Sequence, residues 1–254
     1  MTKKTLPLLC IALATFVSPA SAEIVPRDFD PPPFVSQEGV ESVSAALETK
    51  SYSPEAFDLP VATVNELART IRSTLAFKRV NLEEGQLTGE GCFRYWPAHS
   101  EMRYASRDRM SRLEEMVEAA QEEDVVLGRV ISVEPGFYGG NFVTRIELKP
   151  RRPCGSIDGT QEDREPVTMY LDQYDLTLGQ ERVCMVRPGF YFPQEGDDLL
   201  VLGLMVNPKA RILAPANYFQ VVDREVRLQP LDFVENGSET RLDELLDCAS
   251  EPRP

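Results

Sequence analysis

The chain of 254 residues has one histidine, His99, and contains neither a Cys-x-x-Cys pair nor a Gly-x-Ser-x-Gly sequence. Zinc sites usually take closely spaced cysteine and histidine ligands, and a serine or cysteine nucleophile usually needs an imidazole beside it. These shortages disfavour zinc binding, thiol redox chemistry and histidine-activated catalysis. We therefore expect no metal ion and no cofactor, and we interpret His99 as a surface or packing residue before a catalytic one.

Basic residues are also scarce, because 27 Lys and Arg stand against 41 Asp and Glu, a formal net charge of −14. Nucleic acids and anionic membrane surfaces are bound mainly by lysine and arginine side chains that neutralise phosphates. We therefore expect no nucleic-acid partner. The acidic residues 158–165 and 195–198 lack the alternating spacing of a calcium loop, so we interpret them as solvated loops.

Long hydrophobic runs are confined to the N-terminus. Residues 6–17 are mostly apolar, with Lys3 and Lys4 before them and the small residues 20–22 after them. This order is typical of a cleaved export signal, and the run is too short to span a bilayer. We predict a signal peptide over residues 1–22, cleavage after Ala22, and a periplasmic or secreted protein without a membrane span. Cleavage removes Lys3 and Lys4, so 25 basic and 41 acidic residues remain and the formal charge becomes −16.

Four cysteines follow the predicted signal: Cys92, Cys154, Cys184 and Cys248. An even number of cysteines in an oxidising compartment favours two disulfides, and four cysteines allow three sets of pairings. Sequence does not distinguish these sets. Our preferred set is Cys154 with Cys184, within the strand-rich middle, and Cys92 with Cys248, between the early segment and the tail.

The first part of the exported chain divides into a leader and a helical segment. Residues 23–39 include three consecutive prolines, which predicts a poorly ordered, extended leader. Residues 40–123 are predicted to form a helical N-terminal segment with helices near 58–77 and 106–123. The apolar residues at helical spacing are Val64, Leu67, Ala68, Ile71 and Leu75 in the first helix and Met110, Leu113, Val117 and Ala120 in the second.

The remaining chain has the two-residue period of strands. Between residues 124 and 230, short segments rich in Val, Ile, Leu and aromatics are separated by Gly, Pro, Asp or Asn. The predicted strands are 125–133, 142–148, 167–174, 182–186, 199–206 and 218–226. Six strands at this spacing suggest a small antiparallel barrel. Within residues 231–254, a short helix over 238–249 and a tail are predicted to close an α+β protein.

One pattern occurs twice in the strand region. Residues 129–138 and 182–191 agree at seven of ten positions, and each copy ends in Pro-Gly-Phe-Tyr. Pro followed by Gly is typical of a turn, so each copy is predicted to present a Phe-Tyr pair at a turn tip. The pairs are Phe137 with Tyr138 and Phe190 with Tyr191. Aromatic residues at the mouth of a barrel either contact a ligand or plug the end of the barrel, and both readings stay open.

Two apolar strands support a family resemblance. Residues 124–133 open the strand region with a glycine inside an apolar run, and residues 196–203 form a later apolar strand that begins at a glycine. Their order resembles exported OB-like modules, including netrin-like ones, over residues 124–228. The resemblance implies a small OB-like Greek-key barrel. Netrin-like modules place a cysteine near the mature N-terminus, whereas this chain has none between the predicted signal and Cys92, so their inhibitory wedge is not carried over.

Residues 92–112 are rich in arginine and aromatic side chains against the acidic background. This composition is typical of binding hot spots, because arginine offers forked donors and aromatics offer rigid contact area. The alternative is that the arginines pair with the protein's own acidic surface and that Trp96 belongs to the core. The candidate binding residues here are Arg94, Tyr95, Trp96, His99, Arg103 and Tyr104.

The first functional hypothesis is an exported, non-enzymatic binding or interaction module for a protein, peptide or glycan partner. It depends on the lack of any assembled catalytic or metal motif in the sequence. The alternative is a hydrolase that uses paired carboxylates or His99. An inhibitor of an exported protease is a third hypothesis, and it draws only on the netrin-like resemblance.

Overall fold

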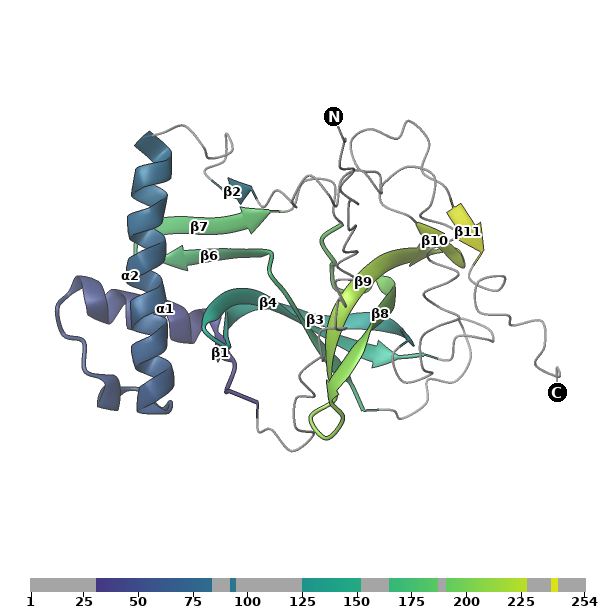
Figure 1. Ribbon diagram of the computed structural model, residues 1–254, viewed down its shortest axis with the longest axis horizontal. Coiled ribbons are helices and arrows are strands. Elements are labelled where there is room, and N and C mark those ends of the chain that lie inside the picture. The colour runs from purple at the N-terminus through teal and green to yellow at the C-terminus, as the bar shows by residue number, and fades with distance from the viewer. Residues whose placement is uncertain are drawn as a thin grey trace, which may run out of the picture.

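The computed structural model describes residues 31–83, 92–94, 125–151, 165–186, 191–227 and 239–241. These residues form an α+β structure with two α-helices, one 3-10 helix and eleven strands in two sheets (Figure 1). The helices are α1 Gln37–Glu48, the 3-10 helix η1 Pro54–Ala56 and α2 Val61–Glu83. The predicted signal peptide, the predicted helix over 106–123 and the tail lie outside the described residues.

The larger sheet has eight strands and curls into a partial ring. Its strands are β1 Val35–Ser36, β3 Val125–Tyr138, β4 Asn141–Pro150, β5 Val167–Leu171, β8 Asp198–Asn207, β9 Ile212–Val222, β10 Glu225–Arg227 and β11 Glu239–Arg241. The smaller sheet has the order β2-β7-β6 and contains β2 Phe93–Arg94, β6 Tyr174–Leu178 and β7 Glu181–Val186.

Helix α2 confirms the amphipathic helix that the apolar spacing predicts. Val64, Leu67 and Ile71 are buried, and Pro60 directly precedes the helix, where its missing N–H costs no helical hydrogen bond. Helix α1 corrects the predicted leader. The leader was expected to extend to residue 39, but Val35–Ser36 pairs with β3 and the helix begins at Gln37. The Ser36 hydroxyl caps this helix by accepting a hydrogen bond from the Gly39 N–H at 3.4 Å.

Most strand predictions hold, with two corrections among the strands and one in the tail. The predicted strand 218–226 covers the end of β9 and the start of β10, which are separated by a turn at Asp223 and Arg224, both with positive φ. The predicted strand 167–174 is two strands in different sheets, because β5 ends at Leu171 and β6 starts at Tyr174. The carbonyl of the buried Gln173 between them accepts a hydrogen bond from Thr144 Oγ1 at 2.7 Å. The predicted C-terminal helix is wrong at its start, since Glu239–Arg241 pairs antiparallel with β10. Residues 242–249 lie outside the described part of the chain.

Five strands pair in the cycle β3-β4-β5-β9-β8, which we call the strand ring. All of these pairs are antiparallel except β5 with β9, which are parallel over only two residue pairs. Alternate residues of the five strands point inward and form one apolar core. Its buried members are Val126, Val130, Ile146, Leu148, Val167, Met169, Leu171, Leu199, Val201 and Leu213.

A second core lies beside the strand ring, in what we call the helical lobe: α1, α2, β1, β2, β6, β7 and the far ends of β3 and β4. Figure 1 shows α2 running across β6 and β7. The buried members of this core are Val35, Val40, Val43, Val64, Leu67, Ala68, Ile71, Phe93, Phe137, Phe142, Tyr174, Leu176, Leu178 and Val183. The β3–β4 hairpin contributes to both cores and therefore joins the two regions.

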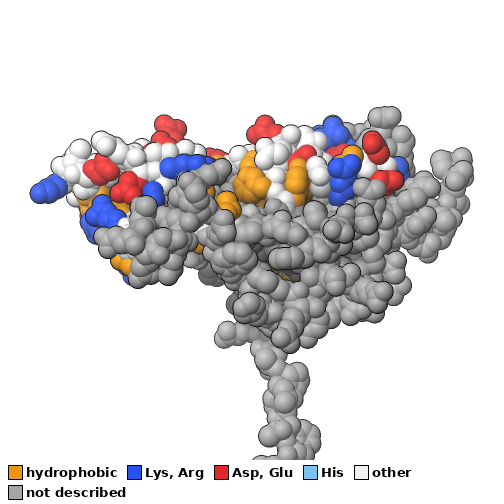
Figure 2. Space-filling model, turned by 90° about the horizontal axis from the view of Figure 1, so that it is seen from above, with side chains coloured by type: hydrophobic (Ala, Val, Ile, Leu, Met, Phe, Trp, Pro, Cys, Tyr) orange, Lys and Arg blue, Asp and Glu red, His pale blue; other side chains and the backbone are white. Residues whose placement is uncertain are grey.

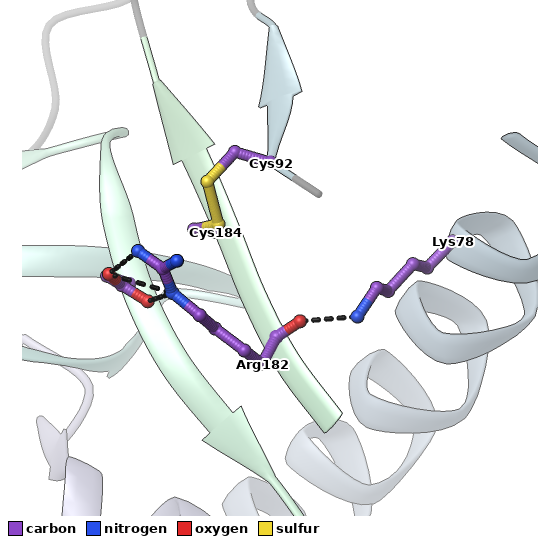
Figure 3. Close-up of a disulfide and its surroundings, with 5 residues drawn as sticks. Lys78, Cys92, Arg182 and Cys184 are labelled. Carbon is purple, nitrogen blue, oxygen red and sulfur yellow. Dashed lines mark hydrogen bonds and ion pairs between the residues drawn. A yellow bond between two sulfur atoms is a disulfide. The ribbon is translucent and has the colours of Figure 1, made fainter. Parts of the chain in front are cut away.

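A disulfide between Cys92 and Cys184 joins the start of β2 to β7 (Figure 3). This pairing corrects the preferred set, which had Cys184 with Cys154 and Cys92 with Cys248. The physical reason is the parallel pairing of β2 with β7, in which Phe93 lies opposite Met185. Cys92 and Cys184 each stand one residue earlier, so their Cα atoms are 4.7 Å apart. Cys154 and Cys248 are outside the described residues.

The Pro-Gly turn predicted after Val133 is also corrected. Pro135 and Gly136 lie inside β3, where they pair with Thr144 and Val143 of β4. The chain reverses four residues later at Gly139 and Gly140, with φ of 55° and 85°. A two-residue hairpin turn needs positive φ at both positions, which glycine adopts without strain. The second predicted turn, at residues 188–189, lies outside the described residues.

Candidate binding surface

The outer face of β3, β4 and β5 carries a row of charged and aromatic side chains. In the sheet register Glu134 lies opposite Arg145, and Arg145 lies opposite Tyr170 on the next strand. Because side chains alternate along a strand, the neighbouring Ile146 and Met169 point into the ring core. The alternation thus puts a basic, an acidic and an aromatic side chain side by side on three adjacent strands. We call this surface the Arg145 face; it consists of Phe34, Glu134, Tyr138, Arg145, Glu147 and Tyr170.

Arg145 is at the centre of the face. Its Nη2 donates to Glu134 Oε2 at 2.6 Å, and its Nε lies 3.7 Å from Glu147 Oε1. The guanidinium carbon stands 4.3 Å from the centre of the Phe34 ring, within cation–π range. Nε is buried without a hydrogen-bond partner among the described residues. Arg145 is therefore held in place by two carboxylates and one aromatic ring, and its side chain is still 29% exposed.

Two tyrosines extend the face. The rings of Tyr138 and Tyr170 are stacked, with centroids 3.9 Å apart and an interplanar angle of 10°. The pKa of Tyr170 is raised to about 12, mainly by burial and additionally by the neighbouring Tyr138 and Glu147, while Arg145 acts in the opposite direction. Burial also raises the pKa of Tyr138. Both phenols are therefore neutral at physiological pH and offer flat, amphipathic contact area of the kind enriched in binding sites.

Tyr191, another predicted site residue, lies elsewhere on the strand ring. Its hydroxyl donates to Asp197 Oδ2 and accepts from Gln220 Nε2 at 3.0 Å, while its carbonyl accepts from Tyr218 OH at 2.9 Å. Burial, and secondarily the hydrogen bond to Asp197, raise the pKa of Tyr191 above the ordinary range. The aromatic side chain of Tyr191 also packs against the buried core of the strand ring. These contacts hold Tyr191 against the strand ring, where it joins a loop to β9.

Phe137 is a packing residue, not an exposed residue at a turn tip. It is 1% exposed, and its ring contacts Phe142 edge-on at 6.0 Å inside the helical lobe. The physical reason is the extended course of β3 through Pro135 and Gly136, which turns Phe137 inward and its neighbour Tyr138 outward. Of the predicted pair, only Tyr138 lies on the Arg145 face.

The arginine-rich segment contributes one described residue, Arg94. Its backbone belongs to β2 and pairs with Val186. The other candidates lie outside the described residues: Tyr95, Trp96, His99, Arg103, Tyr104 and Phe190. The structure thus leaves the hypothesis of a binding patch in that segment as a prediction.

In the described part of the chain, no group of three or more His, Cys, Asp or Glu residues is arranged to hold a metal ion. Likewise, no helix within the described residues is long and apolar enough to cross a membrane. Figure 2 shows one side of the molecule, on whose described part basic and acidic side chains lie next to each other with hydrophobic ones between them. Charge there is mixed, not gathered into a patch of one sign.

Comparison of the chain with protein-family models, with curated proteins and with solved structures found no significant match.

Sequence reasoning missed Phe34, Glu134, Arg145, Glu147 and Tyr170. The alternation of polar and apolar residues in 142–148 was the available signal, since it would put Arg145 and Glu147 on the same face of a strand. The missing information was register, because only the pairing of β4 with β3 and β5 places Glu134 and Tyr170 on either side of Arg145.

Proposed function

We propose that this protein is an exported, non-enzymatic binding module that holds its partner on the Arg145 face. The observation that carries the proposal is the cluster of a stacked tyrosine pair and a fixed, partly exposed arginine on adjacent strands. Tyrosine and arginine dominate binding hot spots because they bring large contact area and several donors at low entropic cost.

The proposal includes an OB-like barrel. The order of pairing supports it: counted along the chain, the first strand of the ring pairs with the second and the fourth, and the fifth pairs with the third and the fourth. The short β5–β9 contact corresponds to a partly open closure. OB-like barrels bind their ligands on the face of the second and third strands and on the adjoining loops. In this chain those strands are β4 and β5, and the first of those loops is the Gly139–Gly140 turn beside Tyr138.

Export is part of the same proposal. The Cys92–Cys184 disulfide is consistent with an oxidising compartment, and the predicted signal over residues 1–22 supplies the route. N-terminal sequencing of protein from the exported fraction is expected to begin at Glu23. An intact N-terminus in the cytosol, with reduced Cys92 and Cys184, would contradict this part of the proposal.

Partner capture tests the binding face. The immobilised protein is incubated with the native exported fraction, and retained molecules are quantified for the wild type, Tyr138→Ala and Tyr52→Ala. Tyr52 is a matched control, since it is a tyrosine of the helical lobe that lies 5.7 Å from the Arg72 guanidinium. We expect Tyr138→Ala to reduce capture at least about tenfold, the effect of removing a hot-spot aromatic, and Tyr52→Ala to leave it unchanged. Equal capture by the three proteins would move the binding site away from the Arg145 face.

A further inference from the structure

The N-terminal segment of the chain is seated on the Arg145 face. Residues 31–34 lead into β1, and the ring of Phe34 lies between Arg145, at 4.3 Å from the guanidinium carbon, and Tyr170, at 6.1 Å between ring centroids. Phe34 is thus part of the face although it comes from a segment about 100 residues earlier than β4. The three residues before it are prolines.

Gly136 provides the space for this segment. A Cβ atom at this position would stand 2.3 Å from the Val35 carbonyl oxygen and 2.5 Å from Cζ of Phe34. Because Gly136 has no side chain, both the backbone of β1 and the ring of Phe34 fit against β3 at this point. Gly136 is not in the left-handed region, so close approach, rather than turn geometry, explains glycine here.

The contact has the form of peptide recognition by strand addition. The backbone of Val35 and Ser36 pairs with Phe137 and Gly136 at the edge of the sheet, and one aromatic side chain enters a site beside it. Such complexes gain affinity from main-chain hydrogen bonds and specificity from the side-chain site. Residues 31–33 lack backbone N–H groups, so they cannot extend the ladder, but prolines keep a segment extended and lower the entropy lost on docking.

We infer that the Arg145 face recognises an extended, proline-rich peptide that places an aromatic side chain on Arg145 and Tyr170, and that residues 31–36 fill this site in cis. The inference rests on the proposed function, because it names the partner class for the same face. A partner peptide of this chemistry must displace Phe34. Residues 31–36 therefore compete with any partner peptide for the face, and a peptide that binds more weakly than this segment does not displace it.

A peptide titration tests the inference. A fluorescently labelled synthetic peptide with the sequence of residues 28–36 is titrated with the purified chain, and binding is followed by fluorescence anisotropy. We expect Phe34→Ala to bind the peptide at least tenfold more tightly than the wild type does. Adding Tyr170→Ala to Phe34→Ala, or replacing the peptide residue that corresponds to Phe34 by alanine, is expected to abolish the gain.

A second variant separates release of the site from damage to the fold. Phe34→Leu keeps apolar volume on Gly136 but removes the ring that faces Arg145, so it is expected to bind the peptide between the wild type and Phe34→Ala. Circular dichroism and thermal melting establish that each variant is folded. A folded Phe34→Ala or Phe34→Leu protein that binds the peptide no better than the wild type overturns the inference, as does binding that is insensitive to Tyr170→Ala.

The two proposals fail in different ways. If Phe34→Ala binds the peptide but the exported fraction contains no partner whose capture depends on Tyr138, the proposed function is contradicted. The docking of residues 31–36 on the Arg145 face would still be supported. Tyr138-dependent capture of a glycan by a protein that does not bind the peptide would keep the binding face and overturn the peptide assignment.

Discussion

The strand ring and the helical lobe are built in different ways. The ring consists of five strands, and its longest pairings, β3 with β4 and β8 with β9, join segments that follow one another in sequence. The lobe assembles residues from four separate stretches, between residues 35 and 186, and its strand β2 has only two residues. The ring is therefore stabilised mainly by backbone pairing around one core. The lobe depends on helix packing and on a covalent link.

The Arg145 face lies where these two regions meet. The β3–β4 hairpin has Ile146 and Leu148 in the ring core, while Phe137 and Phe142 at its far end belong to the lobe core. Phe34 reaches the face from β1, which is continuous with α1 of the lobe. We therefore expect β3, β4 and β5, which carry most of the Arg145 face, to be rigid. Residues 31–36, which cover the face, are attached to the helical lobe, whose fold depends on helix packing and on the disulfide.

The largest expected effect is loss of the disulfide. Replacing both Cys92 and Cys184 by serine removes a link between residues 92 positions apart, which is worth about 4–5 kcal/mol in the chain-entropy description. Hydrogen exchange followed by mass spectrometry is expected to show lost protection in α1, α2, β6 and β7. Amides of β8 and β9 are expected to keep theirs. Equal loss of amide protection in the strand ring and in the helical lobe would contradict the proposed difference between the two regions.

Alkaline pH is expected to weaken the lobe through Tyr174. This side chain is 8% exposed, and burial raises its pKa to about 12 from the ordinary 10.0. Because the folded state favours the neutral phenol, the contribution of Tyr174 to stability is complete below pH 10 and is lost as pH rises towards 12. The loss is at most roughly 2–3 kcal/mol. Urea unfolding at pH 8 and pH 11 is expected to show a smaller decrease for Tyr174→Phe than for the wild type, and parallel decreases would count against this cause.

Two glycines offer a matched comparison of the regions. A Cβ at Gly203 would stand 2.4 Å from the Ala214 carbonyl oxygen of β9, and a Cβ at Gly136 would meet β1 and Phe34. Gly203→Ala strains the pairing of β8 with β9 in the strand ring, so we expect a loss of about 1–3 kcal/mol in the free energy of unfolding measured in urea. Gly136→Ala can be relieved by release of the short β1, so its global effect is expected to be smaller.

Hydrogen exchange supplies the control for these variants. Gly136→Ala is expected to expose the amides of residues 35 and 36 while the ring stays protected. Unlike Phe34→Ala, this variant is expected to bind the peptide of residues 28–36 no better than the wild type, because the added Cβ occupies the space that the peptide's own Phe-Val unit would need. If Gly136→Ala lowered the free energy of unfolding more than Gly203→Ala does, the strand ring would not be the more rigid of the two regions.

The smallest effects are expected from two ion-pair sites. In the ring, Asp198 accepts from Arg129 at 3.1 Å and from Arg151 at 3.0 Å, and its side chain is 16% exposed. In the lobe, Asp175 pairs with Arg182, but their side chains are 56% and 52% exposed. Asp198→Asn is expected to cost about 1 kcal/mol and Asp175→Asn about 0.5 kcal/mol or less, because solvent screens the exposed pair. Equal losses in urea unfolding would show that burial does not separate these two sites.

Much of the secondary structure could be predicted from local pattern. Strand periodicity located most of β3, β4, β7 and β8, and helical spacing located α2. The failures have specific causes. Pro135-Gly136 has the composition of a turn, but tertiary pairing with β4 and the approach of Val35 keep it extended. Residues 35–39 follow a proline run typical of disorder, but the burial of Val35 and Val40 orders them.

The candidate site was predictable only at Tyr138. Its place next to an apparent turn drew attention to an exposed aromatic, and the structure does put it on the outer face. Phe137 was assigned the same role, yet one step along a strand reverses the side chain, so it lies in the core. Arg145 and Tyr170 have no unusual local composition, and only their juxtaposition across strands makes them notable.

The spacing of apolar residues was enough to locate most of β3, β4, β7 and β8 and the helix α2, since these periods follow directly from backbone geometry. Tertiary structure alone decided which cysteines meet and which side chains share the Arg145 face. Both depend on register: β2 beside β7 brings Cys92 to Cys184, and β1, β3, β4 and β5 together bring Phe34, Arg145 and Tyr170 into one surface. Register is a property of the whole packed sheet, because shifting one strand by a residue exchanges its buried and exposed faces.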